Sequence, residues 1–486
     1  MSTTKNVSKT HRETKTVTQT ASTSQNILDL FQLDENIIDK LKINRLEDGV
    51  HICVRLKQQY VVCPSCRAKT NKIKDYRTKS IKHSVLINNQ CFIDYEARRY
   101  TCRRCNKVFY ENNPFTMPSS RMSIATVYNV LNDLKSPQET FTNISKRYGI
   151  SPTTVSSMFD RHIMISRRTL PVYLCLDETY AFKSHDSPYI CVLLDYTNQK
   201  IVDVLPSRKK HDLITYFTSI PRDERLKVKV VSFDMWETYR IVSQIVFPNA
   251  VCAVDRFHVM QELYRKVDRI RLETMRKVKH KKDTLRAKQL LLKNENKKLS
   301  PAEHLELEDA SKYYYVLKKF NWMIFKNQGK QFDPNVEKRY NRVLQIYANY
   351  YDLYTYMVRI DPQLDVAAMF KDEISSLYRD CTIETAPEKL DEIISGLKDS
   401  NIPSMVEFSK TLVRWRREII NSFTIVDEEK NRRISNGLIE NRNKAIKTIK
   451  HNANGYLNWE RFRNRILYCL NDDTTFHMTP INKKEH

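Results

Sequence analysis

Residues 228–237 read VKVVSFDMWE, and this stretch decides the expected fold. Its first half is short, apolar and β-branched, which predicts a buried strand. The strand ends in the carboxylate of Asp234, and an amphipathic helix follows at once. Ligands in an open α/β sheet lie just beyond the carboxyl ends of strands, so Asp234 is positioned to hold a metal ion. A lone Asp at this place more often caps the next helix, so the interpretation depends on the rest of the chain.

The flanking segments predict a ribonuclease H-like core. The expected elements are, in chain order, the strands 172–176, 189–194 and 200–205, a helix at 211–219, the strand 228–233, a helix, the strand 250–254 and a helix from Phe257. Three strands, helix, strand, helix, strand, helix is the element order of that fold. In this order, Asp177 and Asp234 follow strands that neighbour each other at the centre of the sheet.

The composition indicates a large, basic, multidomain protein. The 486 residues suggest about three domains. A formal net charge of +25 favours nucleic acid as a partner over a merely solvated basic surface. With six glycines and no GxGxxG or GxxxxGK[ST] motif, the chain is not expected to use a nucleotide cofactor.

The chain also lacks the sequence signals of membrane insertion or secretion. No apolar run approaches the ~18 to 20 residues of a membrane span, and the N-terminus lacks the apolar segment of a secretory signal. Eleven scattered cysteines are typical of a reducing compartment, with some of them on metal. These features predict a cytoplasmic protein without a membrane partner.

Two CxxC pairs, Cys63–Cys66 and Cys102–Cys105, predict one structural zinc ion. Each turn aims two thiolates at one ion, and four thiolates leave no open position for chemistry. Alternating segments between the pairs suggest a hairpin, as in a zinc ribbon; four unrelated core cysteines are the alternative. Basic and tyrosine side chains surround the pairs and suggest a DNA-contacting module: Lys69, Lys72, Lys74, Arg98, Arg99, Arg103, Arg104 and Lys107, with Tyr76, Tyr95 and Tyr100.

Residues 121–165 predict three short helices. The stretch ISKRYGISPTTVS, residues 144–156, places a glycine at one helix end and Ser-Pro at the next helix start. This pattern is typical of a helix-turn-helix, whose third helix presents Thr153, Thr154 and Ser156 to a DNA groove. A plain helical linker is the alternative.

The C-terminal half predicts long helices and one further acidic site. Within 262–432, the basic run 265–288 either faces DNA or is a solvated surface. Near the end, SNGLIENRNKAIKTIK (435–450) predicts an amphipathic helix. Its polar face carries Glu440, Asn443, Lys444 and Lys447. A surface Glu offset by lysines at i,i+4 is the alternative.

Several sequence motifs together resemble those of the ISL-three family of bacterial insertion-sequence transposases. The matching strings are the two CxxC knuckles, Leu-Asp177-Glu, Asp234-Met-Trp-Glu-Thr-Tyr, Pro248-Asn-Ala, Asp255-Arg-Phe-His258 and Ser435-Asn-Gly-Leu-Ile-Glu440. The resemblance covers residues 50–475, and the order and spacing of the strings make it specific. One departure is Asn441, where the family usually has glycine.

The resemblance implies a DDE transposase with Asp177, Asp234 and Glu440 as its catalytic carboxylates. Two Mg²⁺ (or Mn²⁺) ions would be held there, with Asp177 bridging both, because hard cations prefer carboxylate oxygens. Asp255 and His258 would organise the site. Asn443, Lys444 and Lys447, and more weakly Arg208, would hold DNA phosphates.

The expected function is therefore a transposase that binds the terminal inverted repeats of its element, cuts them and joins them to target DNA, as a homodimer on DNA in the bacterial nucleoid. A non-catalytic DNA-binding regulator and a ribonuclease H-like nuclease without strand transfer are the alternatives. The expected domains are a disordered tail (1–25), a zinc ribbon (26–118), a helix-turn-helix (119–170), the core's first part (171–261), an all-helical insertion (262–432), the core's last part (433–475) and a tail (476–486).

Overall fold

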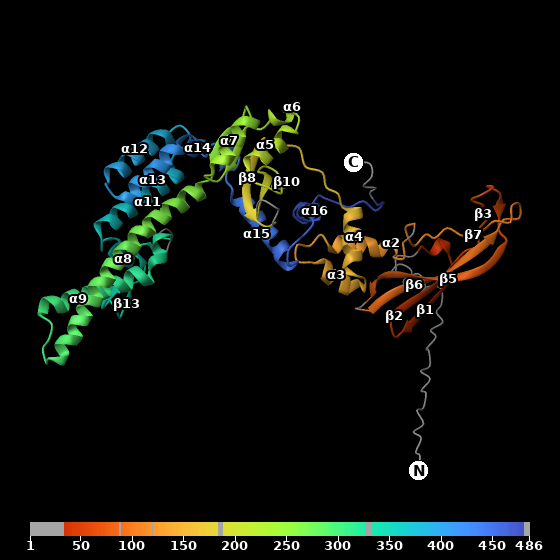
Figure 1. Ribbon diagram of the computed structural model, residues 1–486, viewed down its shortest axis with the longest axis horizontal. Coiled ribbons are helices and arrows are strands. Elements are labelled where there is room, and N and C mark those ends of the chain that lie inside the picture. Colours follow the sequence, from red (N-terminus) through yellow and green to blue (C-terminus); the bar gives the residue numbers. More distant parts are fainter. Residues whose placement is uncertain (1–33, 87–88, 119, 183–187, 327–331, 481–486) are drawn as a thin grey trace, which may run out of the picture. The chain divides into compact units, whose positions relative to one another are not determined.

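The computed structural model describes residues 34–86, 89–118, 120–182, 188–326 and 332–480 (Figure 1). The tail expected at 1–25 and the last residues, 481–486, lie outside this range. The chain divides into two compact units. One unit is Arg167–Lys444, and the other combines Met1–Ser166 with Ala445–His486. No helix in the described ranges is both long and apolar enough to cross a membrane.

A five-stranded sheet lies at the centre of unit Arg167–Lys444. Its strands are β8 (Tyr173–Tyr180), β9 (Tyr189–Asp195), β10 (Lys200–Leu205), β11 (Val230–Phe233) and β12 (Val251–Val254). Their order is β10-β9-β8-β11-β12, with β8 to β10 antiparallel and β11 and β12 parallel to β8. The crossover helices are α5 (Lys210–Thr218), α6 (Arg222–Arg225) and α7 (Glu237–Val246). The strands are apolar runs because both faces of the sheet are buried.

Strand β8 is longer than the sequence predicts, which changes the setting of Asp177. The strand was expected to end at Leu176, but it continues to Tyr180 because β9 pairs with it beyond Asp177. On its other side, β11 is in register with β8 at Ser232 and Cys175 and ends one residue later. Asp177 therefore has a ladder partner on one side only.

The long insertion between the sheet and the last helix of this unit is mostly helical. Its elements are α8 (Arg256–Asn294), α9 (Pro301–Lys319), the 3-10 helix η2 (Asn321–Ile324), β13 (Arg339–Asn341), β14 (Ile346–Ala348), α10 (Tyr350–Val358), α11 (Pro362–Asp380), α12 (Ala386–Asp399), α13 (Pro403–Arg414), α14 (Arg416–Asn421), β15 (Ile425–Asp427) and β16 (Arg432–Arg433). The expectation of an all-helical insertion is thus wrong, because β13 and β14 form a hairpin. The Asn341 side chain accepts from the N–H groups of Val343 and Leu344, which favours this turn over a helix.

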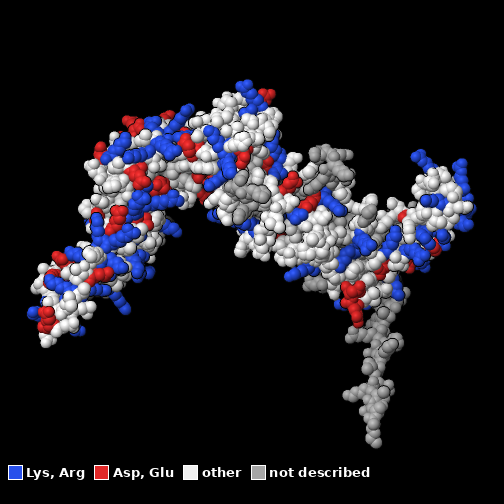
Figure 2. All heavy atoms as spheres, viewed as in Figure 1, with Lys and Arg blue, Asp and Glu red and all other residues white. Residues whose placement is uncertain are grey.

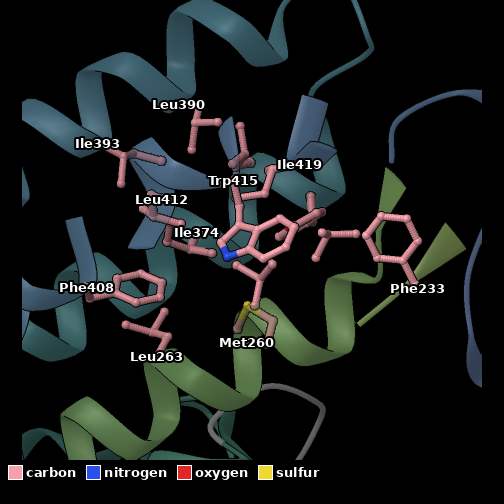
Figure 3. Close-up of a cluster of buried hydrophobic side chains, with 14 of the residues drawn as sticks. Phe233, Met260, Leu263, Ile374, Leu390, Ile393, Phe408, Leu412, Trp415 and Ile419 are labelled. Atoms are coloured by element: carbon pink, nitrogen blue, oxygen red, sulfur yellow. The ribbon is translucent and has the colours of Figure 1, made fainter. Parts of the chain in front are cut away.

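The insertion shares one hydrophobic core with the sheet. Phe233 of β11 and Met260 of α8 belong to the same buried cluster as Trp415 (Figure 3). Trp415 is only 3% exposed. Figure 3 shows its indole surrounded by leucine and isoleucine side chains from the neighbouring helices. The helical block is therefore packed onto the sheet rather than tethered to it by a linker.

The second unit begins with another sheet, whose order is β1-β2-β6-β5 with β7 beside β6. Its elements are the 3-10 helix η1 (Glu35–Ile37), β1 (Ile38–Leu46), β2 (Gly49–Leu56), β5 (Ile73–Leu86), β6 (Asn89–Thr101) and β7 (Val108–Tyr110). A separate ribbon pairs β3 (Val61–Val62) with β4 (Lys69–Thr70). Alternate residues of β6 are buried, as in a sheet that covers a core with one face.

Helices complete this unit, and they come from both ends of the chain. They are α2 (Ile124–Asp133), α3 (Phe141–Tyr148), α4 (Pro152–His162) and α16 (Trp459–Leu470), while α15 (Gly437–Asn452) crosses the division between the units. Ser123, Thr140 and Ser151 cap the first three, and Gly149 ends α3 in the left-handed conformation. Tyr468 of α16 joins their apolar cluster.

Candidate active site

Three neighbouring strands each place an aspartate near the carboxyl edge of the larger sheet. Asp177 lies within β8, Asp234 follows β11, and Asp255 follows β12. The parallel register aligns Ser232 with Cys175 and Phe233 with Val254, so the three carboxylates come from adjacent positions. Ligands of open α/β sheets bind at this edge.

Burial makes the first two carboxyl groups hard to ionise. Asp177 is 9% exposed, and desolvation raises its pKa to about 7, with further increases from the charges of Asp234, Glu178 and Glu440. Desolvation also raises the pKa of Asp234 to about 7, and the Glu178 charge adds to this effect. Such a concentration of negative charge is costly without a cation, so the arrangement favours metal binding.

Helix α15 brings Glu440 to the same site. Two asparagines, Asn436 and Asn443, anchor this helix to the sheet. The Asn436 side chain donates to the Leu176 carbonyl (3.3 Å), and its backbone N–H donates to Asp255 Oδ1 (3.2 Å). Burial raises the pKa of Glu440, and the Asp255 charge raises it further. The hydrogen bonds of Asn436, and the place of Glu440 within 4.8 Å of Asp255, show that the start of the helix faces the acidic edge.

Two residues that were expected to contact DNA phosphates are instead engaged within the protein. Asn443 is 6% exposed and donates from Nδ2 to Asp177 Oδ2 (2.7 Å). Arg208 forms an ion pair with Glu178 (2.5 Å), and its guanidinium lies over the rings of Tyr189 and Trp236. The sequence pattern of α15 put Asn443 on the polar face, but Asn443 is buried together with Ile439 and Ile446.

The other expected DNA contacts remain at the surface. Lys444 and Lys447 are exposed on α15, one and two turns beyond Glu440. On α4, Thr153 is exposed, whereas Thr154 and Ser156 are partly buried. Ser151 caps α4 and shares hydroxyl hydrogen bonds with Thr153 and Thr154.

Glu178 is a charged member of the site that the sequence analysis did not assign. It is the next residue after Asp177, and its pKa is raised by burial. Its Oε2 is buried without a hydrogen-bond partner in the described part of the chain. The motif Leu-Asp177-Glu contains this residue, but the sequence does not indicate its role. Its ion pair with Arg208 in the structure shows that it belongs to the site.

Asp255 and His258 lie beside Glu440. One carboxylate oxygen of Asp255, a ring nitrogen of His258 and a carboxylate oxygen of Glu440 all lie within 4.8 Å of one another. Asp255 is 3% exposed and His258 is partly buried. Burial lowers the pKa of His258 and so favours its neutral form, the form that coordinates metal ions.

The donors of this site fit hard divalent cations. Its oxygens are mainly carboxylates, which Mg²⁺ and Mn²⁺ prefer. Asp234 Oδ1 and Asn443 Oδ1 are buried acceptors without a hydrogen-bond partner among the described residues. Unsatisfied buried acceptors are costly, and a cation beside them would remove that cost.

The four cysteines of the CxxC pairs form a separate cluster with the geometry of a metal site. Their sulfur atoms lie within 4.8 Å of one another, with Cys63 and Cys105 3.7 Å apart and Cys66 and Cys102 3.5 Å apart. Both turns have the same hydrogen bonds, in which Arg67 N–H donates to the Cys63 carbonyl and Asn106 N–H to the Cys102 carbonyl. Backbone N–H groups lower the pKa of Cys102 to about 6, which favours the thiolate that zinc binds.

The basic surface around this cluster is smaller than the sequence suggests. Arg98 is 2% exposed and pairs with Glu111, while Tyr95 and Tyr100 are fully buried. Tyr95 belongs to the apolar core of the sheet, and Arg98 and Tyr100 are buried further along β6. The cations that stay exposed are Lys69, Lys72, Lys74, Arg103, Arg104 and Lys107. Figure 2 shows Lys and Arg gathered on the end of the molecule that carries β3 and β7.

Comparisons with known proteins match both sites to one group. The model of the ISL3 (ISL-three) family, described as a transposase, matches residues 174–466. A second model, described as the zinc-finger of transposase IS204/IS1001/IS1096/IS1165, matches residues 59–105. The match and the four-cysteine cluster together support a structural zinc ion. A curated relative, the transposase for insertion sequence element IS1001 of Bordetella parapertussis, is 19% identical over 409 residues, which cover 83% of this chain and 87% of the relative.

Proposed function

Because the chain belongs to the ISL3 transposase family, we propose that it cuts DNA at the terminal inverted repeats of its own insertion sequence and joins the ends to target DNA. The proposal is supported most directly by the acidic groups Asp177, Asp234 and Glu440 near one edge of the sheet. Asp177 and Asp234 come from adjacent strands, and the pKa of Asp177 responds to the charges of both other groups.

We propose a ribonuclease H-like fold for the unit that carries these carboxylates. The sheet order β10-β9-β8-β11-β12, in which β9 runs opposite to the other four strands, supports this assignment. For the other unit we propose a helix-turn-helix formed by α3 and α4. The left-handed Gly149 between them and the exposed start of α4 at Thr153 support it.

In the proposed mechanism, the residues of the site hold and orient the reacting groups. Two bound divalent ions would activate the attacking oxygen and stabilise the leaving oxygen of a phosphodiester. Asp177 would help to hold these ions, because it lies on the strand next to Asp234 and contacts Asn443 of the helix that carries Glu440. Asn443 fixes the Asp177 carboxylate through Oδ2, and the Glu178 N–H fixes it through Oδ1 (2.8 Å). Each oxygen retains a lone pair for a metal ion.

Double-stranded DNA is the proposed partner. The exposed Lys444 and Lys447 follow Glu440 on the same helix, and the zinc-binding region carries further exposed cations. A reaction that joins both ends of an element has to pair them, so we propose a homodimer on DNA.

The test is metal-dependent cleavage of a duplex that carries the terminal repeat. With Mg²⁺ or Mn²⁺ the parent protein should cut it, and Asp234→Ala or Glu440→Gln should lower the rate by more than about 100-fold. Asp391→Asn is the matched control, because Asp391 is an exposed acid that pairs with Arg416 in the insertion. Its rate should equal the parental rate.

Other outcomes separate the alternatives. Repeat DNA that is bound but never cut indicates a regulator. Pre-cut ends that are not joined to target DNA indicate a nuclease without strand transfer. Equal cleavage by the parent and by Asp234→Ala contradicts the proposed mechanism.

A further inference from the structure

The group formed by Asp255, His258 and Glu440 has a geometry that neither a helix cap nor a simple ion pair explains. Asp255 occupies the N-cap position of α8, yet its side chain makes no capping hydrogen bond. Aspartate at this position normally accepts from the N–H groups of the first turn. Its Oδ1 instead accepts from the N–H of Asn436, beside Glu440.

The three side chains are close together without bonding to one another. Their ligand atoms lie within 4.8 Å, yet in the described chain no hydrogen bond or ion pair joins any two of them. His258 Nε2 is buried and has no hydrogen-bond partner there. An ion with bonds of about 2.1 Å holds opposite ligand atoms about 4.2 Å apart. A spacing within 4.8 Å that exceeds hydrogen-bonding distance is therefore compatible with three ligands of one ion.

We propose that Asp255, His258 and Glu440 together hold a divalent cation, with His258 as its nitrogen ligand. The cation's role in DNA cleavage rests on the proposed function, whereas its binding does not. Glu440 would then be shared between this ion and the acidic pair Asp177 and Asp234.

The backbone preorganises the three ligands. The His258 N–H donates to the Asp255 carbonyl (3.1 Å), which fixes both residues in the first turn of α8. The Glu440 N–H donates to the Asn436 carbonyl (3.1 Å), and the Asn436 N–H donates to Asp255. One asparagine thus links the start of α15 to the start of α8, so the ligands are held before any ion arrives.

The mixed donor set predicts which cations bind best. Imidazole suits transition-metal ions such as Zn²⁺ and Fe²⁺, and Mn²⁺, the first ion of that series, accepts a nitrogen ligand more readily than Mg²⁺, which prefers oxygen ligands. Mn²⁺ should therefore bind this site more tightly than Mg²⁺ does. Asp177 and Asp234, with carboxylate oxygens only, lack this preference.

The test uses Mn²⁺ with the zinc-containing full-length protein in the absence of DNA. Electron spin echo envelope modulation detects a ¹⁴N nucleus bound to Mn²⁺, so the parent protein should show an imidazole signal. His258→Gln should abolish that signal and weaken one class of Mn²⁺ sites by about 10-fold or more. Asp177→Asn should keep the signal, because Asp177 is not a ligand of this ion.

Two controls make the result specific. His280→Gln changes an exposed histidine of the same helix and should leave the ¹⁴N signal intact. Asp255→Asn preserves the shape of the side chain and should weaken Mn²⁺ binding, so it serves if His258→Gln does not fold. Zinc content and thermal melting report whether each variant is folded.

The outcomes distinguish this proposal from the proposed function. A parent protein without a ¹⁴N signal, or a signal that persists in His258→Gln, overturns the histidine-ligated site even if the DNA is cut. A His258-dependent signal in a protein that cuts no DNA supports the metal site and contradicts the transposase mechanism.

Discussion

Asp177 and Asp234 retain protons that a metal ion has to displace. Both carboxyl groups have a pKa of about 7 because burial disfavours their charged forms. A group whose pKa is raised in the folded state stabilises the fold below its unfolded pKa, near 4, and loses that contribution as the pH rises through about 7. Near neutral pH, the metal-free site is therefore a source of instability that cation binding relieves.

This linkage predicts a pH dependence of both stability and metal affinity. The metal-free protein should melt at a lower temperature at pH 8 than at pH 6, and Mn²⁺ affinity should rise between these values. Asp234→Asn should raise the melting temperature at pH 8, because a neutral amide replaces a buried charge. Calorimetric melting and Mn²⁺ titration check both effects. A melting temperature of Asp234→Asn that is lower than the parental one at pH 8 contradicts the assignment.

Asn443 illustrates how one hydrogen bond changes the role of a residue. Its amide donates to Asp177 from helix α15, at 2.7 Å. Asn443→Ala should lower metal-dependent cleavage by about 10- to 100-fold with little change in DNA affinity. Asn441→Ala, an exposed amide two residues earlier, is the control and should cleave at the parental rate. If Asn443→Ala instead weakens DNA binding and leaves metal dependence unchanged, the DNA contact expected from the sequence is correct.

At the scale of single elements, helix α8 carries a basic run of two kinds. Some of its cations form ion pairs with acids of α9, and others are exposed to solvent. Lys281 pairs with Glu306 and Lys288 with Glu303, both on α9. Lys279, Arg286 and Lys293 are spaced by seven residues, or about two helical turns, so they lie on one side of α8. All three are exposed, and no ion pair involves them among the described residues. Figure 2 shows Lys and Arg along this part of the molecule.

We expect this row of cations to contact DNA phosphates. Combining Lys279→Ala, Arg286→Ala and Lys293→Ala should weaken DNA binding and reduce the slope of log K against log salt by up to about 2.7, or 0.9 per phosphate contact. The control combines Lys281→Ala and Lys288→Ala, whose charges α9 already balances, and should change the slope less. Filter binding at several salt concentrations measures both. Equal slopes for the parent and the triple variant would mean that the row is only solvated.

The zinc knuckles are elements whose folding depends on the metal. Purified protein should contain about one zinc per chain, and Cys63→Ser with Cys66→Ser should remove it and unfold the β3–β4 ribbon. Cys381→Ser changes a cysteine of the insertion, outside the cluster, and should keep the zinc. Metal analysis gives the direct answer, and a folded parent protein without zinc would refute the site.

At the scale of the whole molecule, the C-terminal segment of the chain belongs to the same unit as the N-terminal segment. Arg465 of α16 is 1% exposed and donates to the carbonyls of Ser136 and Glu139. Phe476, from the segment expected to be a free tail, packs against Tyr128. The unit that contains α2 to α4 is therefore complete only when the C-terminal segment has been made.

Separate units predict separate unfolding transitions. Arg465→Ala should destabilise only the unit with α16, by about 3 kcal/mol, because it removes two hydrogen bonds from a buried charge. Trp415→Ala should destabilise only unit Arg167–Lys444, by about 3 to 5 kcal/mol, because it leaves a cavity in the shared core. Differential scanning calorimetry should show each variant moving a different transition. A single transition that both variants lower equally contradicts this independence.

Local patterns in the sequence were enough to predict several features of this protein. The CxxC spacing predicted the four-cysteine cluster, and apolar runs predicted the strands that precede Asp234 and Asp255. Gly149 and the Ser151-Pro pair predicted where α3 ends and α4 begins. These predictions succeed because turns, caps and strand periodicity depend on residues that are close together in the chain.

Other features required the tertiary structure. The approach of Glu440 to Asp255 and His258, the inward turn of Asn443 and the packing of α16 against α2 to α4 all join residues that lie far apart in sequence. Periodicity predicts which residues of a helix are polar, but not which polar residue is buried against a distant strand, as Asn443 is beside Asp177. The sequence by itself thus determined which chemical groups this protein carries, and only the packing of distant segments decided which of them meet.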